Sequence, residues 1–117
     1  MFLRVNSIEH GLDLDDAAIA QMKEHGTWYV PTLAVYYIDW APANTSDGQR
    51  DRACSTVHEQ FFKKALKAGL KIAFGTDMGG IPWTEPIAQE FGFMMKFGMS
   101  PWMPSKQRPQ LPSIYST

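Results

Sequence analysis

The sequence predicts an α/β fold in which parallel strands alternate with helices. Three short segments, residues 2–8, 27–33 and 72–74, have the composition of strands. Each is followed by a longer segment whose apolar residues have helical spacing. Strands that alternate with helices of this length form βαβ units, so we expect parallel strands joined by right-handed crossovers.

The apolar run at residues 72–74 fixes the place of a carboxylate. It is too short for a helix and is followed by glycine, which favours a strand buried on both faces. Gly79, Gly80 and Pro82 do not continue a strand, so Asp77 lies just beyond its carboxyl end. Ligands bind at this end of the strands in sheets flanked by helices.

The first strand and helix place a histidine at an equivalent position. Residues 2–8 alternate loosely, and His10 follows them directly. A helix is expected over residues 12–26, with acids in its first turn, Ile19 and Met22 on its apolar side, and a glycine at its end.

The second strand and helix are less regular. Residues 27–33 have strand composition, although Pro31 must lie at an edge or at the strand's end. Residues 41 to 51 are rich in loop-forming types, and a helix is expected over residues 53–68. Its expected inner face consists of Val57, Phe61, Ala65 and Leu66.

A third helix is expected over residues 85–97. Its apolar side would contain Ile87, Phe91 and either Met94 or Met95, and we interpret Phe91 and both methionines as core residues rather than a cofactor site. The sequence after residue 101 has no helical pattern.

Charge and composition narrow the partners. The chain of 117 residues has a net charge of −1, which gives no electrostatic reason to bind nucleic acid or an anionic membrane. Small molecules or proteins are the expected partners. Cys54 is the single cysteine, so no internal disulfide can form. No run approaches the roughly 20 apolar residues of a membrane span, and no signal-peptide pattern is visible, so a cytoplasmic location is expected unless a leader was lost with a missing part.

His10 and Asp77 are the residues with candidate chemistry. A neutral imidazole and a carboxylate at the ends of two parallel strands suit a divalent transition metal. From the residues alone, two structural alternatives stay open. Asp77 could cap a helix or brace a turn, and His10 could be a hydrogen-bonded structural histidine.

The other polar and aromatic candidates have simpler interpretations. His25 lies at the C-terminal end of a helix, where a positive charge interacts favourably with the helix dipole. His58 and Cys54 are placed away from the strand ends as surface or packing residues, and Glu9 should face away from His10. Four aromatic residues could either contact a substrate or pack in the core, and the sequence does not decide between these roles: Trp28, Tyr29, Tyr36 and Tyr37.

Several blocks of sequence, in order, resemble the amidohydrolase superfamily, and the closest branch is the imidazolonepropionase-like and Xaa-Pro dipeptidase-like enzymes. The resemblance extends from about residue 7 to residue 101. The blocks are Ser-Ile-Glu-His-Gly at 7–11, Leu-Asp-Asp at 14–16, Val-Pro-Thr-Leu at 30–33, and Lys-Ala-Gly-Leu-Lys-Ile-Ala-Phe-Gly-Thr-Asp at 67–77.

The resemblance implies a fold and a reaction. The chain would supply about strands 6 to 8, with their helices, of a metal-dependent (β/α)8 TIM barrel. His10 would ligate a divalent metal through one ring nitrogen, and its other ring nitrogen should have a partner. Asp77 would ligate the metal and accept the proton of the attacking water. The implied cofactor is zinc, one or two ions, and the implied substrate is a small amide, cyclic amide or dipeptide whose C–N bond is hydrolysed.

One departure from the family is large. The paired histidines of strand one, the strand-four ligand and the strand-five histidine have no counterpart here, and two ligands do not complete a catalytic metal site. We therefore interpret residues 1–101 as a partial amidohydrolase barrel domain that binds metal poorly and is inactive alone. The alternative is an inactive truncated product or an interaction module.

Residues 102–117 are interpreted as an irregular tail, with a shifted reading frame after Pro101 as a hypothesis. Back-translation of Trp102-Met103-Pro104 from one base earlier forces Asp and Ala at the second and third shifted positions. Permitted codons then extend this reading into a family-like helix with a capping aspartate. The sequence predicts no oligomeric state.

Overall fold

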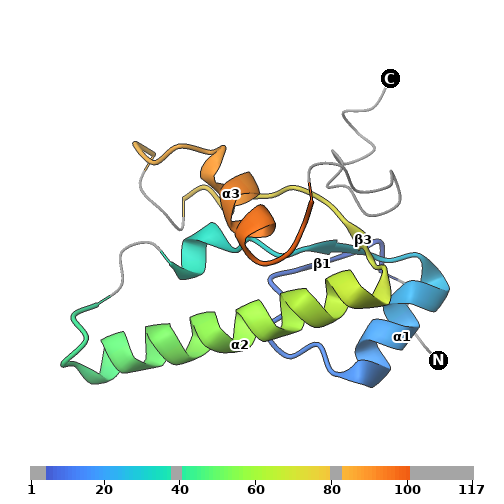
Figure 1. The fold of residues 1–117 in the computed structure, drawn as a ribbon, viewed down its shortest axis with the longest axis horizontal. Helices are drawn as coiled ribbons and strands as arrows, with labels where there is room; N and C mark the ends of the chain where they lie inside the picture. The colour runs from blue at the N-terminus through green and yellow to red at the C-terminus, as the bar shows by residue number, and fades with distance from the viewer. Residues whose placement is uncertain (1–4, 38–40, 80–82, 101–117) are drawn as a thin grey trace.

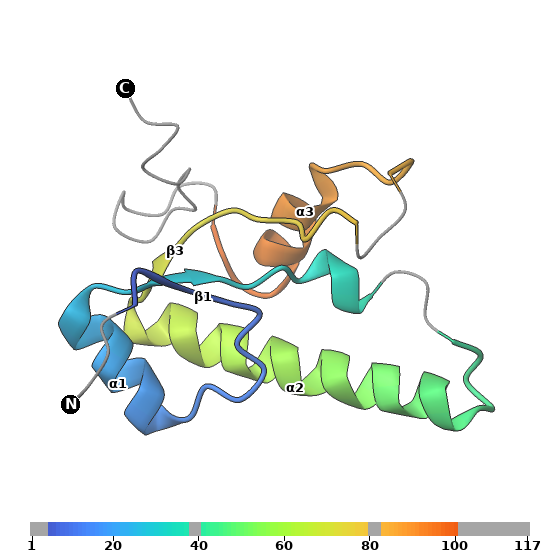
Figure 2. The ribbon, with the colours of Figure 1, turned by 180° about the vertical axis from the view of Figure 1, so that it is seen from behind.

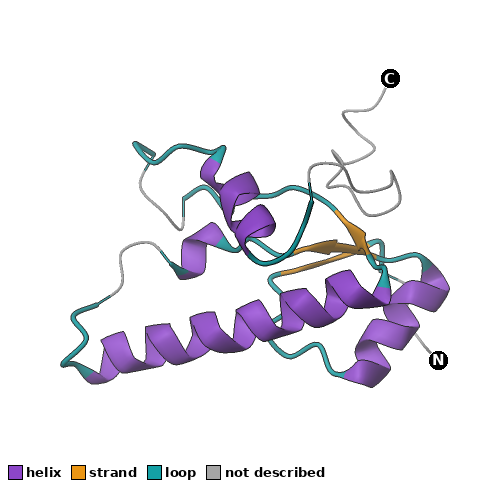
Figure 3. Ribbon diagram, in the orientation of Figure 1, coloured by secondary structure: helices purple, strands orange, loops and turns teal. Residues whose placement is uncertain are grey.

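A computed structural model of the chain describes residues 5–37, 41–79 and 83–100. Within these ranges the fold is α/β, as expected (Figures 1 and 3). The elements in chain order are β1 (Ser7–Glu9), α1 (Asp16–His25), β2 (Trp28–Val30), the 3-10 helix η1 (Ala34–Tyr36), α2 (Ser46–Ala68), β3 (Lys71–Ile72) and α3 (Gln89–Lys96).

The three strands form one sheet in the order β1-β2-β3, and both pairs are parallel. The prediction of parallel strands is therefore confirmed. Tyr29 of the central strand lies opposite both Ile8 and Ile72, and Ala73 N–H donates to the Tyr29 carbonyl at 2.9 Å. Pro31 follows the last residue of β2, where its missing N–H removes no ladder hydrogen bond.

Helices lie on two sides of the strands. In both views α1 and α2 run below the sheet and α3 lies above the segment that follows β2 (Figures 1 and 2). The inner residues of α1, Ile19 and Met22, are buried as predicted. The core cluster contains Leu14, Ile19, Met22, Tyr29, Leu33, Phe62, Ala65, Leu70, Ile72, Met94, Phe97 and Met99.

The helix α1 ends at the predicted glycine, but it begins at Asp16 and not at the expected residue 12. The Asp15 carboxylate accepts from Ala18 N–H at 2.8 Å, which satisfies one of the unpaired N–H groups of the first turn. Gly26 ends the helix with φ 66°, a left-handed conformation that favours glycine.

The helix α2 begins at Ser46, so the prediction of a loop up to residue 51 was wrong. Thr45 is the N-cap, and its hydroxyl accepts from Gly48 N–H at 3.0 Å. A Cβ on Gly48 would lie 2.1 Å from the Pro42 carbonyl oxygen. Glycine at this position therefore permits a close approach of two backbones, although in the sequence it is typical of a loop.

The predicted inner face of α2 was also wrong in part. Val57 is exposed, and Phe61 and Leu66 are only partly buried. The buried residues are Gly48, Ser55, His58, Phe62 and Ala65. The helix is rotated so that two polar side chains face inward, because Ser55 has a hydrogen-bond partner there in the Tyr36 carbonyl and His58 has one in the Pro31 carbonyl.

The helix α3 lies within the predicted range, but its core face differs. Met94 is 0% exposed, whereas Met95 is 48% exposed, so the expectation that both are core residues was wrong for Met95. Phe91 is also exposed and stacks on Phe74 with ring centroids 4.2 Å apart. The inward residues are Glu90 and Met94, one turn apart.

Two predictions concern features outside this α/β unit. In the ranges that the structure describes, no helix combines the length and apolar character needed to span a membrane. The irregular tail, residues 102–117, and the frame shift after Pro101 lie outside the described residues.

Candidate functional site

His10 and Asp77 lie together at the carboxyl ends of the outer strands. His10 directly follows β1 and Asp77 follows β3, and His10 Nε2 is 3.7 Å from Asp77 Oδ2. Their side chains are 40% and 45% exposed. The expected convergence of the two side chains is thus observed, while their role as metal ligands stays a prediction.

The same edge of the sheet contains unusual backbone conformations. His10, Thr32 and Asp77 have φ values of 67°, 49° and 57°, and they are the non-glycine residues with positive φ in the described ranges. This conformation is tolerated by His and Asp but is disfavoured for a β-branched Thr. Each such residue costs on the order of 1–3 kcal/mol and persists only where its surroundings enforce it. Such residues cluster at functional sites, which supports this edge as the site.

Besides Asp77, His10 contacts Thr32, Tyr29 and Tyr36. Its Nδ1 lies 2.6 Å from Thr32 Oγ1, so the ring nitrogen that does not face Asp77 has the partner that metal ligation requires. Tyr29 Oη donates to the His10 carbonyl at 3.1 Å. The Tyr36 ring meets the imidazole edge-on at 5.9 Å. Sequence reasoning did not single out Thr32, although it follows the proline that ends β2.

His58 is a second histidine close to this edge, contrary to its predicted position away from the strand ends. It is 0% exposed, and its Nε2 lies 2.6 Å from the Pro31 carbonyl oxygen. Its ring packs on Tyr36 at 4.6 Å, so the packing role was predicted correctly. Burial lowers the pKa of His58 to about 4, because the charged imidazolium cannot be solvated there.

Glu90 is a buried carboxylate that sequence reasoning missed. It is 0% exposed, and its two oxygens accept from Leu33 N–H at 2.6 Å and Ala34 N–H at 2.8 Å. Burial raises the pKa of Glu90, and the two backbone hydrogen bonds oppose that shift. Its one signal in the sequence is an acid at helical spacing from Met94, on the side of α3 that is buried.

The remaining candidates have structural roles. Glu9 is exposed and accepts from Ser7 Oγ at 2.5 Å. Tyr37 stacks on Phe93 at 5.0 Å and donates to the Ser55 carbonyl at 3.2 Å. Burial, with the nearby Glu59 carboxylate, raises the pKa of Tyr37 to about 12. Of the aromatic candidates, Tyr29 and Tyr36 reach the His10 site, and Tyr37 packs between α2 and α3.

Three other candidates are placed away from His10. His25 ends α1 and is exposed, and Cys54 is partly buried on α2. Trp28 lies under the Lys71 ammonium group, with Nζ 5.4 Å from the ring centroid.

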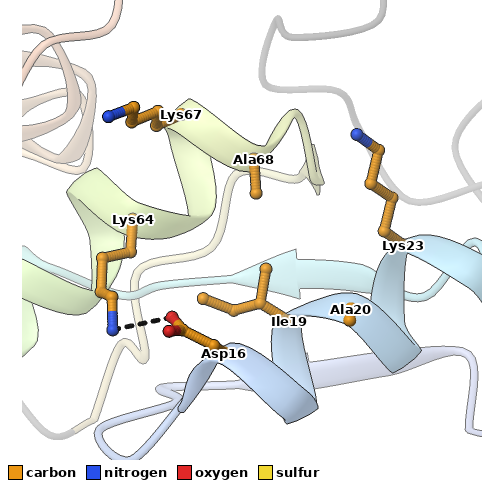
Figure 4. A pocket seen from close by; sticks show the side chains of 7 residues that line it. All are labelled: Asp16, Ile19, Ala20, Lys23, Lys64, Lys67 and Ala68. Atoms are coloured by element: carbon orange, nitrogen blue, oxygen red, sulfur yellow. Dashed lines mark ion pairs between the residues drawn. The ribbon is translucent and has the colours of Figure 1, made fainter.

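A pocket of about 500 Å³ lies between α1 and α2, away from this site (Figure 4). The Lys64 ammonium and the Asp16 carboxylate form an ion pair of 2.9 Å at its edge. Its lining is Asp16, Ile19, Ala20, Lys23, Lys64, Lys67 and Ala68. None of the residues at the strand ends belongs to it, so we do not associate it with the predicted chemistry.

The donor set fits part of a metal site. The described residues contain no group of three or more His, Cys, Asp or Glu side chains arranged to hold a metal ion. His10 Nε2 and the Asp77 carboxylate nevertheless converge, and Nδ1 of the same ring is engaged elsewhere. This chain therefore offers two donors of the types that zinc prefers.

Two solved structures share this fold. One is a Xaa-Pro dipeptidase with methionine bound in its active site, with a TM-score of 0.65 and 35% identity over 81% of this chain. The other is the ochratoxinase of A. niger, with a TM-score of 0.67 and 33% identity over 80% of this chain. The chain resembles amidohydrolase-type hydrolases in sequence and in fold. It covers 25% of the dipeptidase chain and 21% of the ochratoxinase chain.

Relatives identified by sequence are also much longer than this chain. Uncharacterized proteins of Mycobacterium tuberculosis and Mycobacterium bovis are 29% identical over 102 aligned residues, and the match covers 82% of this chain and 27% of each relative. The chain thus spans about a quarter of the length of the curated relatives it matches. No family model matches the chain.

Proposed function

We propose that this chain is the C-terminal part of a metal-dependent amidohydrolase. The complete enzyme hydrolyses a C–N bond in a small amide, cyclic amide or dipeptide. The observation that supports this proposal is the approach of His10 Nε2 and Asp77 Oδ2 to 3.7 Å beyond the carboxyl ends of the two outer strands of a parallel sheet. The likeness to a dipeptidase and an ochratoxinase agrees with it.

Uncovered apolar surface supports a larger barrel. Strands β1 and β3 are both edges of the described sheet, and unpaired edges are normally covered in stable proteins. An exposed apolar stripe consists of Phe91 and Met95 of α3, together with Ile87 in the turn before this helix. We propose that further strands and helices of a (β/α)8 barrel pair with these edges and cover this stripe.

The proposed chemistry needs both strand-end residues. His10, through Nε2, and the Asp77 carboxylate would hold a divalent metal, with zinc the best match to this donor set. When bound, such an ion lowers the pKa of water toward neutrality and polarises a carbonyl. Asp77 takes one proton from the attacking water and returns it to the leaving nitrogen, so that an acid and an amine are released.

The described residues also favour a second candidate for the chain by itself. Two donors do not complete a site of three or four ligands, so the remaining donors would come from other parts of the complete enzyme. We therefore expect weak metal binding and no turnover from the 117 residues alone. In that case the chain is an inactive product or an interaction module.

Metal titration of the purified chain tests the proposed ligands. Zinc binding followed by calorimetry should weaken at least tenfold in His10→Asn and Asp77→Asn, because each removes one donor. His25→Asn and Asp13→Asn are matched controls, since both residues are exposed and lie elsewhere. Equal zinc affinity in all five proteins would refute the assignment.

Turnover and the gene separate the two candidates. Hydrolysis of Xaa-Pro dipeptides or cyclic amides by the 117-residue chain would contradict the inactive alternative. An upstream reading frame that encodes paired strand-end histidines would identify the parent enzyme. A coding strand incompatible with the shifted codons after Pro101 would refute the frame shift.

A further inference from the structure

The tautomer of His10 decides which ring nitrogen has a lone pair to offer. In a neutral imidazole one nitrogen carries the proton and the other is the acceptor or ligand atom. His10 Nδ1 lies 2.6 Å from Thr32 Oγ1, and His10 Nε2 faces Asp77. The direction of the hydrogen bond to Thr32 therefore fixes the tautomer.

The Thr32 hydroxyl has one proton to donate, and the Pro31 carbonyl competes with His10 Nδ1 for it. Thr32 Oγ1 lies 2.7 Å from the Pro31 carbonyl oxygen, which can only accept. If the hydroxyl donates to this carbonyl, only its lone pairs face His10. His10 Nδ1 must then be the donor, which leaves Nε2 unprotonated.

His58 also forms a hydrogen bond with the Pro31 carbonyl. Its Nε2 lies 2.6 Å from the Pro31 carbonyl oxygen, so Nε2 must carry the proton. His58 Nδ1 is buried and has no hydrogen-bond partner among the described residues. A protonated Nδ1 would be an unpaired buried donor, so His58 is neutral, in agreement with its lowered pKa.

We propose that Thr32 and His58 are positioning residues that hold His10 in the Nδ1–H tautomer, with the Nε2 lone pair directed toward Asp77. We call the ordered set His58, Pro31 carbonyl, Thr32 and His10 the imidazole relay. This inference rests on the proposed function in one respect, namely that a divalent cation would be ligated by this lone pair. The hydrogen-bond geometry from which we infer the tautomer is present without the cation.

The backbone around Thr32 explains why the relay persists. A β-branched residue at φ 49° is strained. The residue before it is held by His58 of α2, and Leu33 N–H and Ala34 N–H after it are held by the Glu90 carboxylate of α3. Two helices thus fix the segment that presents the hydroxyl to His10.

The tautomer can be read without metal. The chain has three histidines, so long-range ¹H–¹⁵N correlation spectra at pH 8 give three ring patterns, and His25→Gln assigns one of them. We expect Nδ1–H for His10 and Nε2–H for His58. A wild-type His10 in the Nε2–H form overturns the proposal whatever the variants show.

Matched substitutions test each positioning residue. Thr32→Val removes the hydroxyl but keeps the branched shape, and we expect His10 to shift toward the Nε2–H form that an unconstrained histidine ring favours. Thr32→Ser retains the hydroxyl and should keep the wild-type pattern. The His58 pattern reports in both variants whether the core is folded. An unchanged His10 tautomer in Thr32→Val overturns the role of Thr32.

His58→Phe keeps an aromatic ring against Tyr36 but removes the donor to Pro31. We expect a mixture of His10 tautomers in this variant, and an unchanged pattern overturns the role of His58. Zinc affinity should fall about 10- to 100-fold in Thr32→Val relative to Thr32→Ser. A zinc affinity that is unchanged in His10→Asn, together with the expected tautomers, would contradict the proposed function and leave the relay standing. Equal zinc affinity in Thr32→Val and Thr32→Ser would overturn the relay's effect on the metal.

Discussion

Individual residues at the strand ends combine strain with polar contacts. His10, Thr32 and Asp77 all adopt positive φ, and Thr32 links His10 to the segment after β2. Holding three non-glycine residues in this conformation costs free energy that contacts elsewhere must offset. Two buried side chains, His58 and Glu90, make hydrogen bonds directly before and after Thr32. Their contributions can be measured separately.

His58 should make stability depend on pH between about 6.5 and 4. Its pKa is about 4 when folded and 6.5 as a model histidine, so the unfolded chain takes up this proton first as pH falls. Stability is therefore fully present above pH 6.5 and is lost toward pH 4. The shift corresponds to up to roughly 3 kcal/mol.

The measurement compares wild type with His58→Phe by urea unfolding from pH 8 to pH 4. Glu90, whose raised pKa acts in the opposite direction, is present in both proteins and cancels in the difference. The wild type should lose stability relative to the variant as pH falls. A difference that stays constant over this range would show that His58 is not buried in its neutral form.

Glu90→Gln should destabilise the fold by about 1–3 kcal/mol, because a buried N–H loses its acceptor. The carboxylate accepts from Leu33 N–H and Ala34 N–H, whereas an amide has one oxygen and would turn a donor toward the second N–H. Chemical denaturation measures the loss. Glu24→Gln is the control, since Glu24 is exposed on α1 and should change stability by less than about 0.5 kcal/mol. Equal effects in the two variants would contradict the capping role.

At the scale of elements, each helix is defined by its ends and by the face it buries. The ends follow local signals, as Asp15 and Gly26 show for α1. The buried faces of α2 and α3 do not follow apolar spacing, because His58 and Glu90 face inward where they have partners.

Thr45→Ala should cost about 1 kcal/mol and loosen the first turn of α2, since the Thr45 hydroxyl is the acceptor for Gly48 N–H. Thr56→Ala is the matched control. Thr56 is exposed in the middle of the same helix, and its hydroxyl bonds only the Arg52 carbonyl of the preceding turn. Urea unfolding and helical circular dichroism provide the measurement. A loss in Thr56→Ala as large as that in Thr45→Ala would argue against the cap.

At the scale of the whole molecule, a small sheet and three helices share one core while apolar surface remains exposed. The core cluster joins residues from the three α-helices and from the two strands β2 and β3. Phe91 and Met95, on the outer side of α3, are exposed and do not belong to it. This division between core and uncovered surface can be tested with neighbouring residues of one type.

Met94→Ala should cost about 2–5 kcal/mol, because it leaves a cavity in the core. Met95→Ala should change stability by less than about 0.5 kcal/mol, because the side chain is nearly half exposed. Both variants make the same chemical change in adjacent residues, so helix propensity cancels. Unfolding free energies from denaturant titration provide the comparison. Similar losses at the two positions would mean that the outer side of α3 is covered in solution.

Local sequence signals were enough to predict the kinds of element, the parallel strands, and the meeting of His10 and Asp77. Strand composition, glycine stops and helix caps act within a few residues. Two βαβ units then place the carboxyl ends of all three strands at one edge. The order of strands and helices is therefore enough to predict that the side chains following those ends lie close together.

Only the tertiary structure decided which side of each helix is buried and what holds His10 in place. Thr32 lies 22 residues from His10, His58 lies 27 residues from Pro31, and Glu90 lies 57 residues from Leu33. A polar side chain is buried only where a hydrogen-bond partner is available, and the packing of segments that are distant in sequence decides where such a partner lies. The apolar spacing within one helix does not indicate whether such a partner exists. The sequence by itself therefore determined the elements and the strand ends, whereas three-dimensional packing determined the hydrogen bonds around them.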